Sequence, residues 1–404
     1  MRKLLALLIL SSTVAFAQNS FYSSYGFGIE SLPLPVRMIG MGNTGNAVED
    51  SLSLNTLNPA FWNGFLTTSL QGQVESSFLN VPDVPFNNML SRFMGFSFKL
   101  PISKKIGVAF GVMPTTRVHA ENAFVDSTAF SDSFVKYKYS VEALGGISEF
   151  FIGGGYRINP QWRIGIKMQL YFGNYVNKGS TDINNNGTVD SYYKRRMDVN
   201  GSQIGLGFAW VDKSGKICLS GYVNQSIKFK YNTEYDYFYG PDSTVGFKSL
   251  NYPSSYRIGI SKKLPKNLAF NADFRFTKVS PSLFSNFYQF EKTSSNNSYF
   301  IGVGLEKLPA NNIRENKFLK RLFIRIGAYY KTEPFYYLQT VVEESGASFG
   351  IGVPFHKGFN RLDMALVASK RDGFLSEKIG SEKVISLHIG VTTGEIWFRK
   401  LKRH

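Results

Sequence analysis

The chain has 404 residues, of which 43% are hydrophobic and 15% aromatic, and it carries a formal net charge of +17. Its single cysteine, Cys218, excludes an intramolecular disulfide, and we expect it to act as a small wall-filling side chain. After the first residues no stretch of about 18 apolar residues occurs, which excludes a helical membrane protein.

The first residues, MRKLLALLILSSTVAFAQNS, are typical of a secretory signal peptide. A basic pair at 2–3 precedes an apolar run over 4–14, and residues 15–17 (AFA) form an A-x-A cleavage site. We therefore expect residues 1–17 to be removed and the mature chain to begin at Gln18, outside the cytoplasm. Its basic charge suits outer-membrane lipid and lipopolysaccharide, and export disfavours nucleic acid as a partner.

Residues 37–50, RMIGMGNTGNAVED, contain Gly40, Gly42 and Gly45 in the G-x-G-x-x-G spacing of a dinucleotide-binding loop. Such a loop follows a buried strand, but two prolines in the preceding SLPLP argue against a central strand. The acid that follows, Asp50, is too close to the glycines to reach a ribose. We therefore interpret the match as accidental and predict no cofactor.

From about residue 65 onward, apolar and polar residues alternate with the period of a β-strand. In WRIGIKMQLYF at 162–172, Ile164 and Ile166 fall on one face and Arg163 on the other. Similar runs lie at 66–74, 92–100, 105–113, 146–158, 202–211, 216–229, 254–263, 268–276, 297–307, 320–331, 346–356, 360–370 and 384–391. The pattern predicts roughly fourteen strands of about 9 to 11 residues, the length that crosses a bilayer when tilted.

The connections between these runs alternate in length. Tight turns such as INPQ and DKSGK separate long polar segments, of which the longest lie at 115–132, 177–191, 231–246 and 279–297. This alternation is typical of an outer-membrane barrel with tight periplasmic turns and long outer loops, whereas the turns of a soluble sandwich need not alternate. We therefore predict an all-β fold, a closed transmembrane antiparallel β-barrel of about 14 strands over residues 65–398.

Glycines recur on the inward faces of the predicted strands, as in IGVAFGV, IGLGFAW and FIGVGLE. Two readings stay open: something approaches the backbone closely, or the glycines relieve crowding in a curved sheet. Arg163, Arg257 and Arg325, each in an RIG triplet, also face inward. We expect them to pair with acids of the wall or of protein inside the lumen rather than to bind substrate. His388 also points into the lumen, and no nucleophile motif accompanies it, so no catalytic residue is predicted.

The segment at 37–61, RMIGMGNTGNAVEDSLSLNTLNPAF, resembles the start of the long-chain fatty acid transporter family of outer-membrane proteins (FadL/OMPP1/TodX-like). Weaker similarities lie at 256–276 and 385–398. The resemblance implies a barrel of about fourteen strands whose N-terminal segment, here 18–64, forms a small helical plug or hatch in the lumen. Chains of that family commonly end at an aromatic residue. Here a basic tail at 399–404 follows the last aromatic residue, which departs from the family.

The resemblance also implies a gating role for this segment. Its glycines would let the backbone turn tightly against a glycine-lined wall, and its Asn-Pro pair would end any preceding helix. The predicted hatch residues are Gly40, Met41, Gly42, Gly45, Asn58, Pro59, Ala60 and Phe61. Pro114 either bends the third strand, which in that family opens the wall sideways to the membrane, or ends the strand near the outer rim.

A weak calcium-loop pattern occurs in DINNNGTVD. Its candidate ligands are Asp182, Asn184, Asn186 and Asp190. The last ligand position, where calcium loops carry a bidentate Glu, is Tyr193. An ordinary Asn/Gly-rich outer loop is therefore favoured, and no metal is predicted.

We predict an outer-membrane channel, not an enzyme, that passes hydrophobic molecules such as long-chain fatty acids or hydrocarbons and is gated by the N-terminal hatch. The alternative is an outer-membrane shuttle or assembly component of a type IX-like secretion system, for which long aromatic loops would supply contacts. A general solute porin is disfavoured because small residues line the lumen. The barrel-assembly machinery is an expected partner during biogenesis.

Overall fold

The computed structural model describes residues 20–24, 28–31, 34–64, 67–80, 88–130, 133–183, 185–249, 251–280, 293–309, 318–337, 340–355, 358–373 and 381–397. The predicted signal peptide at 1–17 and the basic tail at 399–404 lie outside these residues, so both stay predictions. No helix in the described ranges is long and apolar enough to cross a bilayer.

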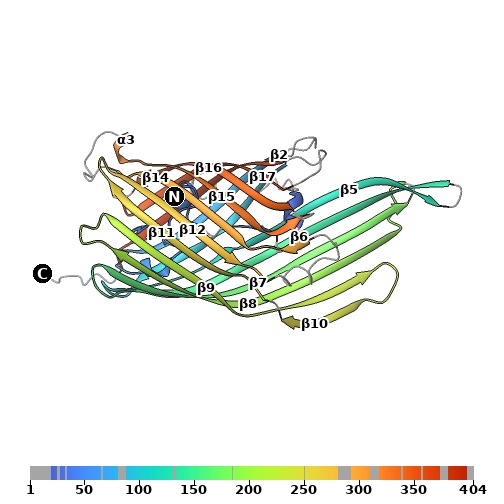
Figure 1. The fold of residues 1–404 in the computed structure, drawn as a ribbon, viewed down its shortest axis with the longest axis horizontal. Coiled ribbons are helices and arrows are strands. Elements are labelled where there is room, and N and C mark those ends of the chain that lie inside the picture. The colour runs from blue at the N-terminus through green and yellow to red at the C-terminus, as the bar shows by residue number, and fades with distance from the viewer. Residues whose placement is uncertain are drawn as a thin grey trace.

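The chain folds as a closed antiparallel β-barrel of 14 strands, as the sequence predicted (Figure 1). Closure is made by β18 (Glu382–Glu395), which pairs with β2 (Thr68–Asn80) along its length. The other wall strands are β3 (Asn88–Pro101), β4 (Ile106–Pro114) with β5 (Thr116–Phe130), which count as one, β6 (Ser133–Arg157), β7 (Trp162–Ile183), β8 (Ser191–Val211), β9 (Ile217–Tyr237), β11 (Ser254–Leu264), β12 (Leu268–Lys278), β14 (Ser298–Lys307), β15 (Phe323–Tyr337), β16 (Thr340–Phe355) and β17 (Asn360–Asp372). The short elements β10 (Ser243–Ser249), β13 (Thr293–Ser295) and α3 (Phe318–Arg321) are additions to this wall.

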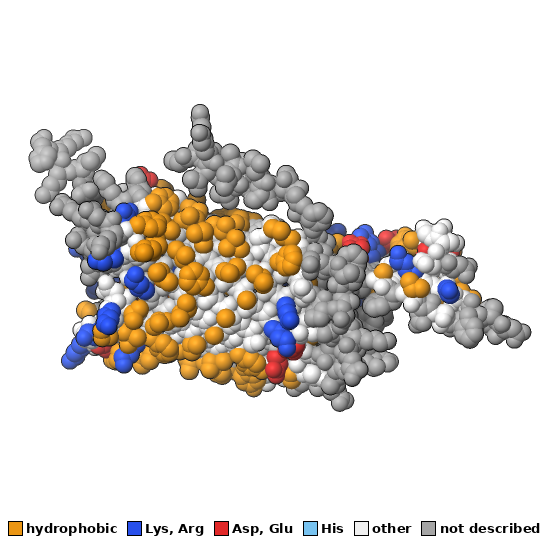
Figure 2. All heavy atoms as spheres, turned by 90° about the horizontal axis from the view of Figure 1, so that it is seen from above, with side chains coloured by type: hydrophobic (Ala, Val, Ile, Leu, Met, Phe, Trp, Pro, Cys, Tyr) orange, Lys and Arg blue, Asp and Glu red, His pale blue; other side chains and the backbone are white. Residues whose placement is uncertain are grey.

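The two faces of the wall have opposite character. On β7, Ile164, Ile166 and Met168 are exposed on the outer face, whereas Arg163 and Lys167 are buried on the inner face. Repeated around the barrel, this alternation makes the apolar belt that Figure 2 shows, with charged side chains at its margins. A barrel with this belt suits lipid, which offers no partner for an unpaired strand edge.

The N-terminal part of the chain lies inside the barrel. Its elements are η1 (Phe21–Ser24), β1 (Ile29–Glu30), α2 (Val36–Ile39) and η2 (Pro59–Phe61). We call residues 34–64 the plug. The predicted helical character is slight, since α2 has four residues and η2 three, and the rest of the plug is turns and irregular backbone. Its Asn, Ser and Gly content explains this, because such residues favour turns over helix.

One wall strand is broken in the middle. β4 and β5 both pair with β6, on either side of Thr115, so they form a single strand interrupted just after Pro114. β4 ends at Pro114 and the wall strand resumes as β5 after Thr115, so the role of Pro114 in opening the wall stays a prediction. Before the break, β4 pairs with β3; after it, the free edge of β5 pairs instead with β1 of the N-terminal segment. The amide of Ser31 donates to the Thr115 carbonyl (2.8 Å), so the N-terminal segment covers the break.

Four strands continue well beyond the belt. β6 to β9 have 25, 22, 21 and 21 residues, about twice the length that a bilayer requires. We call their outer parts, at 133–145, 175–183, 191–202 and 225–237, the overhang; β5 and β10 flank it (Figure 1). The prediction that 115–132, 177–191 and 231–246 are loops was therefore wrong for most of their length. The physical reason is that period-two patterns such as KYKYSVEAL persist outside the membrane, where adjacent strands satisfy one another's hydrogen bonds.

The turn between β8 and β9 is organised by one carboxylate outside the membrane. The hydroxyl of Ser214 and the backbone amides of Ile217, Ser214 and Lys216 donate to Asp212 and lower its pKa to about 2. Because the folded pKa lies below the unfolded value of about 3.9, the stabilisation is present above that value and is lost as the pH falls through about 2.

We expect Asp212→Asn to lower the thermal unfolding midpoint of the detergent-solubilised barrel at pH 6, with the difference from the wild type vanishing near pH 2. Circular dichroism at several pH values measures both midpoints. Asp242→Asn, at an exposed position in the β9–β10 connection, is the control and should change nothing. A deficit that persists undiminished at the lowest pH would show that the charge of Asp212 is irrelevant.

Candidate functional site

The plug touches one side of the wall through glycines. A Cβ built on Gly327 of β15 would lie 2.2 Å from the backbone nitrogen of Gly42, and one on Gly304 of β14 would lie 2.4 Å from the Met41 carbonyl oxygen. Gly42 has a left-handed φ of +67°, which favours glycine. Plug and wall thus meet backbone to backbone, and any side chain at these wall positions would push the plug away.

The opposite side of the wall repeats this arrangement around the Asn-Pro pair. Cβ atoms on Gly165 and Gly207 would lie 2.2 Å from the Pro59 carbonyl carbon and 2.1 Å from Asn58 Oδ1. Asn58 caps η2 by accepting from the Ala60 amide (2.9 Å), and its Nδ2 donates to the Gly221 carbonyl (3.1 Å). A close approach to the backbone, one of the two open readings, therefore applies to these glycines.

Other wall glycines fit the second reading. A Cβ on Gly201 would lie 2.2 Å from the Phe229 ring, and one on Gly346 would lie 2.6 Å from the Tyr329 ring, both on neighbouring strands. These glycines make room for large inward side chains. Both interpretations of the inward glycines therefore apply, each to a different set of wall positions.

Six buried charges form a closed ring that ties the plug to the wall. Each charge lies between two of opposite sign. In order, the contacts are Arg37–Asp50 (2.9 Å), Asp50–Arg361 (2.7 Å), Arg361–Asp363 (2.6 Å), Asp363–Arg325 (2.7 Å), Arg325–Glu306 (2.7 Å) and Glu306–Arg37 (2.6 Å). Arg37 and Asp50 come from the plug, and the other four residues come from β14, β15 and β17.

No side chain of the ring is more than 7% exposed. Buried charges are tolerated when each is fully paired and hydrogen-bonded, and removing one partner leaves the others uncompensated. Three arginines balance three acids, so the ring is neutral. The ring therefore resists withdrawal of the plug, since pulling out residues 37–50 would take one of two buried partners from Arg361 and from Glu306.

A second carboxylate of the wall holds the plug by its backbone. Asp273 of β12 accepts from the amides of Gly45 and Asn46 (2.9 Å each) and pairs with Arg257 (3.3 Å). On the other side, Arg163 of β7 pairs with Glu49 of the plug (2.8 Å). The three RIG arginines therefore pair with acids of wall or plug, as the sequence predicted.

The remaining plug residues pack against the wall. Met41 and Ile39 join Phe300, Tyr329 and Val367 in one buried cluster. A second cluster contains Ala60, Phe61 and Ala209, and in a third the ring of Trp62 lies 5.6 Å from that of Phe151. All eight predicted hatch residues therefore contact the barrel or the rest of the plug, and their gating role stays a prediction.

His388 lies on β18 with its Nε2 3.0 Å from Ser386 Oγ and its Nδ1 3.9 Å from a Glu75 carboxylate oxygen. Glu75 belongs to the neighbouring wall strand β2.

The carboxylates of the candidate calcium loop accept hydrogen bonds from backbone amides. Asp182 accepts from the amides of Asn186 (2.9 Å) and Gly187 (2.8 Å), and Asp190 accepts from that of Ile183 (2.6 Å). Asn184 lies outside the described residues. Within the described ranges no group of three or more His, Cys, Asp or Glu could hold a metal. The loop geometry is that of the ordinary turn favoured by the sequence.

Sequence reasoning missed five ring members, all but Arg325: Arg37, Asp50, Glu306, Arg361 and Asp363. A signal existed for two of them, because Arg361 and Asp363 are two apart on a strand and so share its inward face. Which partner each meets depends on the barrel register, which no local pattern contains.

We expect Arg37→Met to weaken the attachment of the plug by about 3–5 kcal/mol, because Asp50 and Glu306 lose a buried partner. The urea concentration at which protease first cuts the plug of the folded barrel measures the change. The matched control is Arg196→Met, which breaks an exposed pair with Asp198 and should cost about 0–1 kcal/mol. Equal urea midpoints for the two variants would contradict a latching role.

We expect Gly327→Ala to displace the plug, since its methyl group would meet the Gly42 nitrogen and the Met41 carbonyl carbon at 2.2 Å. Overpacking of this kind costs about 1–3 kcal/mol. The control is Gly72→Ala on β2, where nothing lies within 4 Å of the added atom. Planar-bilayer recordings should show more frequent openings for Gly327→Ala alone, and identical records for the two variants would rule out this contact as a determinant of closure.

Comparisons with known proteins identify both a family and a fold. The BamG family model matches residues 1–404. A Pseudomonas aeruginosa FadL homologue has a similar structure, with TM-score 0.59 and 10% identity over 94% of this chain and 99% of that chain. The Ralstonia pickettii toluene transporter TbuX gives 0.54 and 13% over 93% and 99%, and the P. putida toluene transporter TodX gives 0.52 and 12% over 94% and 100%.

No curated protein sequence matches the chain. The structural neighbours are transporters and channels rather than enzymes, and at these identities the similarity shows the fold alone. The chain therefore has the fold of FadL-type outer-membrane channels for hydrophobic compounds, and it belongs to the BamG family.

Proposed function

We propose that the protein admits hydrophobic molecules, such as long-chain fatty acids or hydrocarbons, through its barrel, with the plug as the gate. The fold supports this, since TodX and TbuX, which share it, are described as toluene transporters. The structure is then the closed state, in which the plug occupies the lumen and the N-terminal segment covers the break beside β5.

The observation that carries the proposal is a buried apolar layer next to that break. Val118 and Ala120 follow directly after Thr115 on β5, and the layer continues across the lumen. Its other members are Tyr22, Ala143, Ile147, Tyr171, Tyr175, Met197, Val199, Phe229, Tyr231, Val279, Phe335 and Val342. An apolar passenger that crosses the wall at the break, or descends from the outer mouth, would meet this layer first.

The open volume beside the layer is small. A cavity of about 190 Å³ lies there, lined among others by Thr115, Tyr171 and Tyr252. Ligand pockets usually have about 300–1,000 Å³, so a passenger requires the N-terminal segment or the plug to move. The passenger must then bind the displaced state more tightly than the closed one by more than the displacement costs.

We expect deletion of residues 37–61 to leave a folded barrel that conducts in planar bilayers, because the wall is closed by β2 and β18 without any help from the plug. Heat-modifiable migration on gels verifies folding. Mass spectrometry of lipids carried by the purified full-length protein is the second measurement and should find fatty acid or another apolar molecule. A deletion variant that folds and stays silent, together with a full-length protein free of apolar ligand, would refute transport.

A second function, as a plugged scaffold in outer-membrane assembly or type IX-like secretion, is supported by the ring of six charges. A gate that moves at every transport event would have to break several buried ion pairs each time, whereas a scaffold needs its lumen permanently closed. The family name, BamG, also suggests a relation to barrel assembly. Co-purification of exported or membrane proteins in place of apolar ligand would favour this role.

A further inference from the structure

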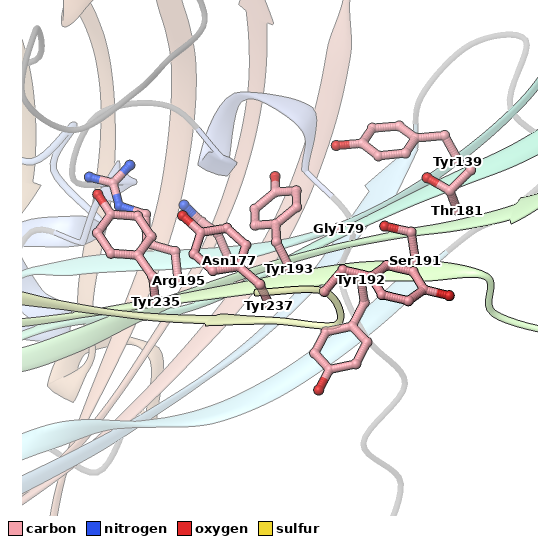
Figure 3. Close-up of a pocket in the computed structure, with 11 residues that line it drawn as sticks. Tyr139, Asn177, Gly179, Thr181, Ser191, Tyr192, Tyr193, Arg195, Tyr235 and Tyr237 are labelled. Carbon is pink, nitrogen blue, oxygen red and sulfur yellow. The ribbon is translucent and has the colours of Figure 1, made fainter. Parts of the chain in front are cut away.

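The inner face of the overhang carries a row of tyrosines outside the membrane. It continues the lumen side of β6 to β9 and holds a cleft of about 540 Å³ (Figure 3). The cleft is lined by Tyr139, Asn177, Gly179, Thr181, Ser191, Tyr192, Tyr193, Arg195, Tyr235, Tyr237 and Tyr239. The belt residues of β7 end near Phe172, so these tyrosines do not face lipid tails.

The two faces of the overhang differ sharply in charge. Because side chains alternate along a strand, nearly all the charges of β6 to β9 fall on the outer face. They are Lys136, Lys138, Glu142, Lys178, Asp182, Lys194, Arg196, Asp198, Lys228, Lys230, Glu234 and Asp236. Arg195 is the one charged side chain of these four strands, as far as they are described, on the tyrosine face. A solvated outer face is ordinary, whereas an uncharged aromatic face open to water is not.

The tyrosine face is held in a fixed arrangement. The ring of Tyr193 occupies the space where a Cβ of Gly179 would lie, 2.2 Å away. The rings of Tyr235 and Tyr237 are parallel with centroids 6.0 Å apart, and the Arg195 guanidinium lies 5.8 Å from the centre of the Tyr235 ring. Rigid aromatic side chains lose little entropy on binding, which favours them in binding surfaces.

The residue types are those of protein-binding surfaces. Tyrosine and arginine dominate the energetics of interfaces, and a mixture of Tyr, Ser, Gly and Asn with Arg is the composition of antibody binding sites. The overhang is also flanked by strand edges: beyond His119, whose backbone bonds to Ser20 and Ser23, the outer edge of β5 has no strand partner in the described residues. Such an edge offers main-chain hydrogen bonds to a polypeptide.

We propose that the tyrosine face of the overhang is a docking surface for an extended segment of a partner protein, with an acidic side chain of that segment meeting Arg195. A polypeptide is favoured over a glycan because the edge of β5 that flanks the overhang offers main-chain hydrogen bonds that a strand can complete. This docking surface lies outside the barrel and does not depend on what passes through the lumen.

Site-specific photocrosslinking in cells tests the proposal. The photoreactive residue p-benzoylphenylalanine is placed at Tyr237 on the tyrosine face or at Lys178 on the outer face, which is exposed and does not line the cleft. We expect one discrete polypeptide adduct from position 237 and none from 178, with Asp or Glu close to the attachment site in the crosslinked peptide identified by mass spectrometry. A lipopolysaccharide adduct, an adduct between two copies of this chain, or equal adducts from both positions would overturn the proposal.

The charge is tested in the same background. Arg195→Glu should lower the yield of the adduct from position 237 at least about tenfold, as expected for a central interface arginine. The matched control, Arg196→Glu on the outer face, should change the yield less than about twofold, as for charges outside an interface. Heat-modifiable migration shows that each variant has a folded barrel, and an adduct that is insensitive to Arg195→Glu would also overturn the proposal.

Discussion

The closed ring of Arg37, Asp50, Arg361, Asp363, Arg325 and Glu306 is the constraint on which the interior of this barrel depends. Every member is buried and satisfied on two sides, so the ring is stable only when all of its contributors are in place. Three wall strands and two points of the plug must therefore adopt one relative position. The glycine contacts on both sides of the lumen follow from that position, because the plug backbone is held too close to the wall for any side chain between them.

The same arrangement divides the molecule into regions with different tasks. Around the ring, wall and plug are joined by ion pairs and backbone contacts, which resist movement. Toward the outer mouth the lumen contains a buried apolar layer, and beside it the wall is broken after Pro114 and covered by β1. If hydrophobic molecules pass, the break and the apolar layer are where they enter, and the ring is the barrier that they must still circumvent.

Family and fold allow two kinds of activity. The chain shares its fold with toluene transporters, but only about one residue in ten is identical. The similarity therefore indicates the architecture of the wall and does not identify a substrate. The overhang has charges on one face and tyrosines on the other. It lies outside the membrane, apart from any passage through the lumen. A barrel of this kind can therefore interact with partners through the overhang whether or not its plug ever moves.

The sequence by itself determined the barrel, because period-two alternation and closure in lipid are local and general consequences of the residue pattern. It also indicated which residues face inward: the RIG arginines, the wall glycines and the segment at 37–61. The length of the overhang was misjudged, because polar residues outside a membrane carry the same alternation whether they form strand or loop, and only pairing with neighbours decides. The ring could not be predicted from the sequence for a similar reason. Asp50 and Arg361 are over 300 positions apart, and only the strand register and the path of the plug bring them to 2.7 Å.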